Sequence, residues 1–198
     1  MNTMHFLGWN LIGQYPEGDF DGVGSFLLCH EGEAALLEVP PGLTVERVRA
    51  EINRLHCTLR FVTASHDHED HLDSSVWRQL NKYFTMAQFI HPATVHGDWI
   101  LRLCGEPVYL VKAPKHSLSD VVTIFRGVAM TGDIELETLD SVSDEVGFLY
   151  RANSFERLAE FEERRGYKVH SIVSAHLNDV RRDVNWKSLF LAEGIPVG

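Results

Sequence analysis

The stretch SHDHEDH, residues 65–71, places three histidines and three carboxylates within seven positions. It overlaps the end of LRFVTAS (59–65), a short apolar run with the residue types of a β-strand. Buried imidazoles and carboxylates lose hydration, and neighbouring carboxylates repel each other, so such a cluster is stable inside a fold only when a cation holds it together. We therefore expect a buried strand that ends at a metal site.

Length and composition indicate one folded unit, and the partner that we expect is a small-molecule substrate and not nucleic acid. A chain of 198 residues with 44% hydrophobic residues can bury a full core, and no linker or internal repeat divides it, so residues 1–198 are expected to form a single domain. The formal charge of -10, without a Lys- or Arg-rich stretch, argues against a nucleic-acid partner. No apolar run approaches the roughly 20 residues of a membrane span. Because the first residues also lack a secretory pattern, we expect a cytoplasmic protein; the sequence does not indicate its oligomeric state.

Hydrophobic periodicity predicts a mixed α/β chain. SFLLCHEGEAALLEV (25–39) has two apolar runs around a short polar turn and predicts a hairpin. TVERVRAEINRL (44–55) has helical spacing, with Thr44 placed at the N-cap. Further strands are expected at 87–91, 108–113, 120–126, 128–132 and 169–175, and SFERLAEFEERRG (154–166) is expected to be a helix ended by Gly166.

The histidine motif divides into two neighbouring sets of ligands. His66, His68 and Asp70 are two positions apart, so in an extended segment their side chains point to the same side. Apolar residues recur every four positions from 72 to 84 and predict a helix that begins near Asp70 or His71. If the chain turns into a helix there, His71 reaches the same centre, and the helix N-terminus favours the negative Asp70.

Neither set completes a metal site, because zinc normally takes about four ligands. The remaining ligands are expected at the ends of other strands, which converge on a common rim in α/β folds. VYLVKAPKH ends in His116, VAMTGD ends in Asp133, and VHSIVSAH ends in His176. These three residues are the candidates for completing the site.

With these residues in order, the sequence resembles the metallo-β-lactamase fold superfamily. The HxHxDH signature of that superfamily corresponds to residues 66–71, and its later His, Asp and His, each at a strand end, correspond to His116, Asp133 and His176. Its early hairpin, which ends in an acidic residue, corresponds to AALLEVP, and the resemblance covers about residues 23–176. It implies a four-layer αββα sandwich with two mixed β-sheets and a dinuclear metal site on one edge.

The resemblance also implies which residues bind which metal. It assigns His66, His68 and His116 to the first metal and Asp70, His71 and His176 to the second, with Asp133 bridging the pair. Two zinc ions are expected, with iron as the alternative, because imidazole and carboxylate ligands do not exclude iron. Many true β-lactamases of the superfamily have Cys where this chain has Asp133, which favours the branches that resemble glyoxalase II and lactonases.

A metal-dependent hydrolase is the first functional expectation. Two metals that share a water lower its pKa toward 7, and the hydroxide attacks a carbonyl carbon while a metal polarises the carbonyl oxygen. Asp70 is the expected catalytic residue, which orients the nucleophile and accepts its proton. The substrate would be a thioester, a lactone or another activated ester. The alternative is an oxidoreductase with one non-haem iron that resembles persulfide dioxygenases, because relatives of this fold use similar ligands for that reaction.

The sequence leaves two possible roles open for each of two charged residues, and it predicts a packing role for the cysteines. Glu38 either orients a ligand histidine or simply finishes a strand. Lys115 either meets an anionic part of the substrate or is solvated. Cys29, Cys57 and Cys104 are an odd number at wide spacings, so we expect reduced thiols packed in the core.

Overall fold

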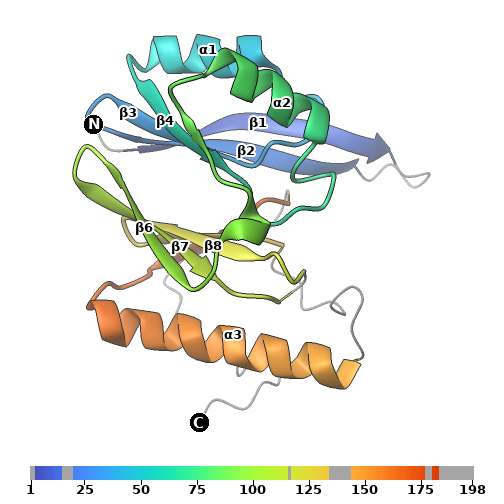
Figure 1. Ribbon diagram of the computed structural model, residues 1–198, viewed down its shortest axis with the longest axis vertical. Coiled ribbons are helices and arrows are strands. Elements are labelled where there is room, and N and C mark those ends of the chain that lie inside the picture. The colour runs from blue at the N-terminus through green and yellow to red at the C-terminus, as the bar shows by residue number, and fades with distance from the viewer. Residues whose placement is uncertain (1–2, 15–19, 116, 134–143, 177–179, 183–198) are drawn as a thin grey trace.

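The structure of the protein, a computed structural model, describes residues 3–14, 20–115, 117–133, 144–176 and 180–182. Two β-sheets face each other, and helices cover their outer sides (Figure 1). The helices α1 (Val45–Arg54) and α2 (Ser74–Tyr83) lie on the first sheet, and α3 (Asp144–Arg165) lies on the second. The predicted four-layer αββα sandwich is therefore confirmed.

In the described residues, the first sheet has five strands in the order β1-β2-β3-β4-β5. These strands are β1 (Thr3–Gln14), β2 (Phe20–His30), β3 (Glu33–Leu37), β4 (Thr58–Thr63) and β5 (Gln88–Phe89). The pairs β1–β2 and β2–β3 are antiparallel and the pairs β3–β4 and β4–β5 are parallel, so the sheet is mixed. The predicted hairpin is confirmed as β2 and β3. The sequence did not reveal β1, because its register shifts twice and breaks the alternation of residues along the strand.

The second sheet, as far as the described chain shows it, has the order β11-β10-β9-β8-β7-β6. Its strands are β6 (Asp98–Leu103), β7 (Glu106–Lys112), β8 (Val121–Phe125), β9 (Val128–Gly132), β10 (Ser171–Ser174) and β11 (Val180–Arg182). The pair β9–β10 is parallel and the other pairs are antiparallel. The four strands from β7 to β10 lie where the sequence predicts them. The sequence did not reveal β6, a half-exposed edge strand in which the exposed Ile100 interrupts the alternation of polar and apolar residues.

The helix after the histidine motif begins later than predicted. The first residue of α2 is Ser74, and the Asp73 carboxylate caps the helix by accepting the N–H groups of Ser75 at 2.9 Å and Val76 at 2.8 Å. The motif itself forms bends and turns. The predicted start near residue 70 is thus wrong, and Asp70 does not lie at the N-terminus of this helix.

The other two helices follow the sequence more closely. Thr44 caps α1 as predicted, with its hydroxyl accepting the N–H of Arg47 at 3.2 Å. The helix α3 begins earlier than the predicted residue 154 and ends before Gly166, whose φ of 62° is the left-handed conformation that glycine allows. Among the described helices, none combines the length and the apolar character needed to cross a membrane.

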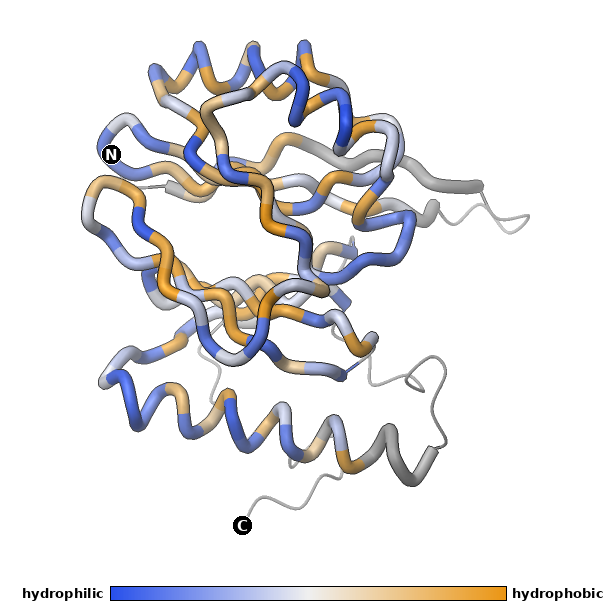
Figure 2. Tube along the Cα trace, in the orientation of Figure 1, coloured by the Kyte–Doolittle hydropathy of each residue, from blue (hydrophilic) through white to orange (hydrophobic). Residues whose placement is uncertain are grey.

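Three hydrophobic clusters fill the spaces between the four layers. One lies between the first sheet and α1 and α2, a second between the two sheets, and a third between the second sheet and α3. Figure 2 shows hydrophobic segments along the strands of both sheets and an alternation of hydrophilic and hydrophobic residues along the helices. Cys29 and Cys57 belong to the first cluster, whereas Cys104 is exposed in the turn after β6. The predicted core position is therefore wrong for Cys104.

Candidate metal centre

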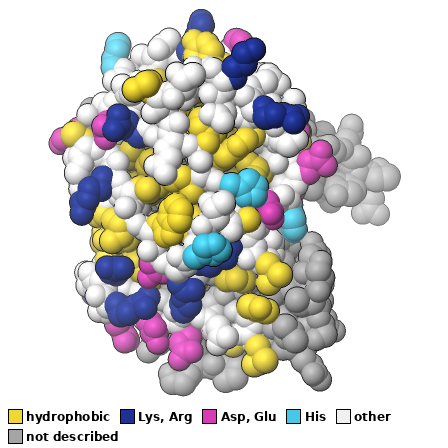
Figure 3. Space-filling view, in the orientation of Figure 1, with side chains coloured by type: hydrophobic (Ala, Val, Ile, Leu, Met, Phe, Trp, Pro, Cys, Tyr) yellow, Lys and Arg dark blue, Asp and Glu magenta, His cyan; other side chains and the backbone are white. Residues whose placement is uncertain are grey.

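The candidate metal ligands come from loops that meet at one edge of the sandwich. His66, His68, Asp70 and His71 lie in the loop between β4 and α2, which we call the motif loop (residues 65–72). Asp133 follows β9 and His176 follows β10, two neighbouring parallel strands of the second sheet. Figure 3 shows histidine side chains near an acidic side chain on one face of the molecule, but His66 and His71 are fully buried and do not form part of this surface. His116, the remaining candidate ligand, lies outside the described residues.

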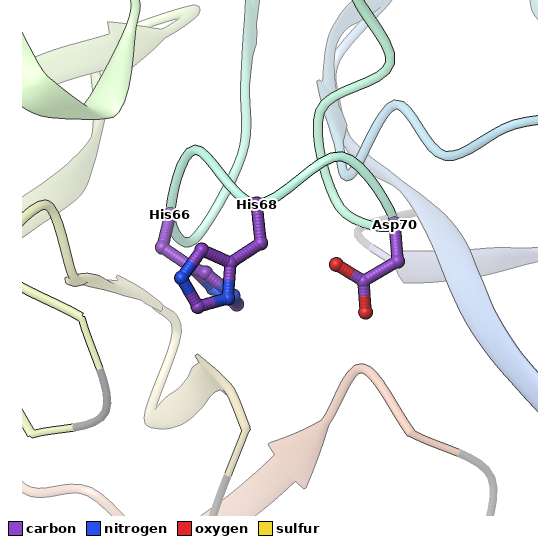
Figure 4. A group of neighbouring side chains, drawn as sticks. All are labelled: His66, His68 and Asp70. Carbon is purple, nitrogen blue, oxygen red and sulfur yellow. The ribbon is translucent and has the colours of Figure 1, made fainter. Parts of the chain in front are cut away.

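The motif loop directs its first three candidate ligands to the same side. Figure 4 shows the side chains of His66, His68 and Asp70 projecting from one loop into a common space. One ligand atom of each lies within 4.8 Å of the others, and the rings of His66 and His68 are 4.5 Å apart. The shared direction agrees with the sequence expectation. Its expected cause was wrong, because turns of the backbone, and not an extended segment, produce it.

The tightest group of ligand atoms is formed by His71, Asp133 and His176. Asp133 Oδ1 lies 2.9 Å from Nε2 of His71 and 2.9 Å from Nε2 of His176, and the two Nε2 atoms are 3.2 Å apart. Ligand atoms around a tetrahedral zinc ion, with bonds of about 2.0–2.1 Å, are separated by about 3.3 Å. Asp70 Oδ2 lies 3.7 Å from Nε2 of His71 and faces the same group. The donor set and its close spacing are therefore suited to hold a metal ion.

The Asp133 carboxylate lies between the two predicted ligand sets. Its Oδ1 atom contacts His71 and His176 from the second set, whereas its Oδ2 atom lies 3.9 Å from Nε2 of His66 in the first set. A carboxylate can bind two cations when its two oxygens face different ligand groups, and Asp133 has this orientation. The individual metal-binding roles, including that of Asp133 as a bridge, stay predictions.

Burial and charge strongly perturb the titration of this cluster. Burial lowers the pKa of His66 far below its usual range, and the neighbouring His71 acts in the same direction. Burial also opposes charge on His71, but hydrogen bonds to Asp133 and Glu38 outweigh it and raise the pKa of His71 to about 10. Although burial of the Asp133 carboxylate acts in the opposite direction, hydrogen bonds from His176 and His71 hold the pKa of Asp133 well below its usual range. Without metal, His71 and Asp133 therefore form a buried ion pair.

The Glu38 carboxylate contacts the ring nitrogen of His71 that faces away from Asp133. Its Oε2 atom lies 3.2 Å from Nδ1 of His71, and its carboxylate also accepts the backbone N–H of Ser65 at 3.2 Å. Glu38 has φ of 63°, a conformation rare for residues other than glycine, and its backbone N–H donates to Thr63 at 3.1 Å. The hydrogen bond that Glu38 accepts from His71, a candidate ligand, corresponds to one of the two roles that the sequence left open.

Ser65 contacts the inner nitrogens of two candidate ligands. Its hydroxyl oxygen lies 3.0 Å from Nδ1 of His66 and 3.3 Å from Nδ1 of His71. Gly132, which precedes Asp133, makes room for this hydroxyl: a Cβ atom there would overlap Ser65 Oγ and lie 2.5 Å from Ser65 Cβ. The sequence analysis did not identify Ser65, although its place directly before the first motif histidine and the glycine in TGD were available signals.

Lys115 and Asp120 form a buried ion pair beside the cluster. Lys115 Nζ lies 3.6 Å from Asp120 Oδ2, and both side chains are almost completely buried. The other oxygen of Asp120 lies 3.8 Å from Nδ1 of His66. Of the two roles that the sequence left open for Lys115, the solvated one is therefore wrong. Asp120 was missed because its partners follow from the folded loop and not from its place in the sequence.

Comparisons with known proteins identify the fold. A scan against models of protein families finds no match, and a search of curated proteins finds no match either. Solved structures do match: a metallo-β-lactamase from Pontibacter korlensis has a TM-score of 0.62 at 16% identity, covering 95% of this chain and 92% of that chain. A metallo-β-lactamase family protein from Thermus thermophilus has a TM-score of 0.60 at 17% identity, covering 96% and 79%.

The metallo-β-lactamase IND-7 is similar to the same extent, with a TM-score of 0.62 at 15% identity over 95% of this chain and 91% of that chain. These likenesses extend over nearly the whole chain. The protein therefore has the metallo-β-lactamase fold, as the residues of its motif and strand ends predicted. Within this fold, it has a group of histidine and aspartate side chains that is suited to hold a metal ion.

Proposed function

We propose that the protein is a metal-dependent hydrolase that holds two zinc ions and cleaves a thioester, a lactone or another activated ester. The observation that carries this proposal is the Asp133 carboxylate, with Oδ1 at 2.9 Å from both His71 and His176 and Oδ2 turned toward His66. Bound at such a site, a zinc pair supplies an activated water at neutral pH and polarises the carbonyl oxygen of the substrate.

Asp70 is the residue that we assign to proton transfer. Its side chain is about a third exposed, at 31%, whereas that of His71 beside it is fully buried. An accessible carboxylate next to the ligand atoms is placed to orient the attacking water and to accept its proton. Asp70 would therefore act on the reacting atoms, while Glu38 and Ser65 hold the imidazole rings in their orientations.

The Ser65 hydroxyl, which contacts the cluster, is not suited to be the nucleophile. Ser65 is buried, and its hydroxyl lies between the imidazoles of His66 and His71. Cys29 belongs to the cluster of core residues under α1 and α2, and Cys104 lies in the turn after β6. The attacking oxygen in this proposal therefore comes from water. Substrates with good leaving groups, such as thiolates, are expected to react faster than amides.

The experiment is a substrate panel on protein prepared without metal and then loaded with either zinc or iron. Small acyl thioesters, lactones, simple esters and a persulfide are supplied, and acid release and oxygen uptake are measured together. We expect acid release from a thioester or lactone on the zinc form, and its loss in Asp70→Asn. Oxygen uptake with the persulfide on the iron form, without hydrolysis on either form, would replace this proposal with the dioxygenase alternative.

A further inference from the structure

A loop of the second sheet contacts the motif loop through residues that are not candidate ligands. This loop, which we call the clamp loop, connects β7 to β8, and its described residues are 113–115 and 117–120. The Ser119 hydroxyl donates to Asp67 Oδ1 at 2.5 Å and accepts the backbone N–H of Asp67 at 3.1 Å. Directly after the loop, Val121 donates its N–H to the carbonyl of Ser65 at 2.7 Å. The clamp loop and the first residue of β8 therefore contact the motif loop on both sides of His66.

The clamp loop is held in shape by its own buried polar groups. The hydroxyls of Ser117 and Ser119 lie 2.8 Å apart, and Ser119 donates its backbone N–H to Ser117 Oγ at 3.1 Å. Asp120 Oδ2 accepts the backbone N–H groups of Lys115 at 2.8 Å and Ser117 at 2.9 Å. Ser117, Ser119 and Asp120 are all buried. Because these groups satisfy one another, the Ser119 hydroxyl is presented to Asp67 in one defined position.

Asp67 differs from His66, His68 and Asp70 because its carboxylate contacts the clamp loop and does not belong to a group of candidate metal ligands. Of the described residues, the groups that suit a metal ion include His66, His68 and Asp70, but not Asp67. Asp67 is exposed, and its carboxylate accepts a hydrogen bond from a residue of the other sheet. A hydrogen bond to an ionised carboxylate is shorter and stronger than a neutral one. This carboxylate is therefore suited to fix the loop and not to bind the metal.

The candidate ligands come from both sheets, so the distance between the motif loop and the second sheet determines whether their ligand atoms fit one metal centre. His66 and His68 belong to the motif loop, whereas Asp133 belongs to the second sheet. We infer that Asp67 and Ser119 form a clamp that holds the motif loop against the second sheet and so sets the spacing of the metal ligands. Both are positioning residues. The inference rests on the proposed function, because it concerns the same metal centre.

The test is a double-mutant cycle on zinc affinity, with Asp67→Ala, Ser119→Ala and the double variant. Zinc affinity of each metal-free protein is measured by competition with a chelator, and the visible spectrum of the cobalt-loaded form reports ligand geometry. Loss of a residue that orients metal ligands typically weakens metal affinity by about 10- to 100-fold. We expect such a loss in each single variant, with an altered cobalt spectrum. The double variant should lose no more than one single variant, because each residue acts through the other.

Two further variants separate positioning from general stability. Thr63→Val removes one buried hydroxyl, which donates to Ile90 at 2.9 Å within the first sheet, and is expected to leave zinc affinity unchanged. Asp67→Asn keeps a side-chain oxygen that accepts from Ser119, so it is expected to retain more affinity than Asp67→Ala. Because Asp67 is exposed, this comparison remains decisive even when Ser119→Ala fails to fold.

The outcomes distinguish the clamp from the proposed function. Wild-type protein that binds no zinc would overturn both. Wild-type protein that binds zinc, with single variants of equal affinity, would overturn the clamp alone. Additive losses in the double variant would also overturn it, because they would mean that Asp67 and Ser119 act independently.

Discussion

Glu38 Oε2 lies 3.2 Å from Nδ1 of His71, and the opposite nitrogen of the same ring, Nε2, lies 2.9 Å from Asp133 Oδ1. The imidazole is thus held between two carboxylates, one behind it and one in the candidate metal centre. An acceptor on the inner nitrogen fixes the tautomer and the orientation of a histidine that binds metal through its outer nitrogen. Glu38, from the end of β3, therefore controls how His71 meets a metal.

We predict that Glu38→Gln weakens zinc binding by about 10- to 100-fold, because an amide orients the His71 imidazole less firmly than a carboxylate does. Chelator competition on metal-free protein measures this affinity. Glu46→Gln, an exposed position in the first turn of α1, is the matched control and is expected to bind zinc like the wild type. Equal affinities in the two variants would exclude an orienting role for Glu38.

Asp133→Asn is expected to leave the fold largely intact and to reduce the number of metal ions held per chain. The reason is that a neutral amide is a poor bridge between two cations. Elemental analysis after dialysis gives the metal content, and circular dichroism checks the fold. Unchanged metal content and unchanged activity would count against Asp133 as the shared ligand.

Zinc binding is expected to release protons at neutral pH. The hydrogen bonds that raise the pKa of His71 to about 10 keep its imidazole protonated in the metal-free protein, and a metal binds only the neutral ring. Zinc affinity should therefore rise with pH until about 10. Because this pKa lies above its ordinary value of 6.5, the ion pair stabilises the metal-free protein fully below 6.5, and this contribution is lost as the pH rises through about 10.

Calorimetry in two buffers with different heats of ionisation measures the protons released on zinc binding. A heat of binding that is independent of the buffer would contradict the protonated state of His71. The pH dependence of thermal unfolding, measured without metal, provides an independent check on the same group.

Gly132→Ala is predicted to destabilise the protein by about 2–5 kcal/mol, from a side chain in a left-handed conformation together with overpacking against Ser65. Gly97→Ala is the matched control. Gly97 has a similar φ, 73° against 69° for Gly132, but a Cβ there meets no atom within 4 Å. The control should cost only the conformational part, about 1–2 kcal/mol. Urea unfolding measures the loss of unfolding free energy in both variants. Equal losses would show that Ser65 moves away from the added Cβ atom at little cost in free energy.

Much of the fold was readable from local patterns. The hairpin of β2 and β3, the capped helix α1 and the strands from β7 to β10 follow from the spacing of apolar residues and from turn and cap residues. The helix α2 begins at Ser74 and not near residue 70, where the spacing of apolar residues placed it, because the Asp73 carboxylate caps its first turn. The edge strand β6 and the bulged strand β1 lack a clear alternation, so only pairing with their neighbours defines them.

The sequence by itself determined the chemistry of the site: the histidines and carboxylates of residues 66–71 follow a buried strand, and Asp133 and His176 end two others. The type of a side chain and the end of a strand are local properties, so both can be recognised in the sequence and are found again in the folded structure. Only the tertiary structure decided which other side chains hold the residues of the motif loop in place. Glu38 reaches His71, and Ser119 reaches Asp67, across 33 and 52 positions of the chain. The first contact depends on the parallel pairing of β3 with β4, and the second on how the two sheets pack, because burial and distance arise from the whole fold and not from the neighbours in the sequence.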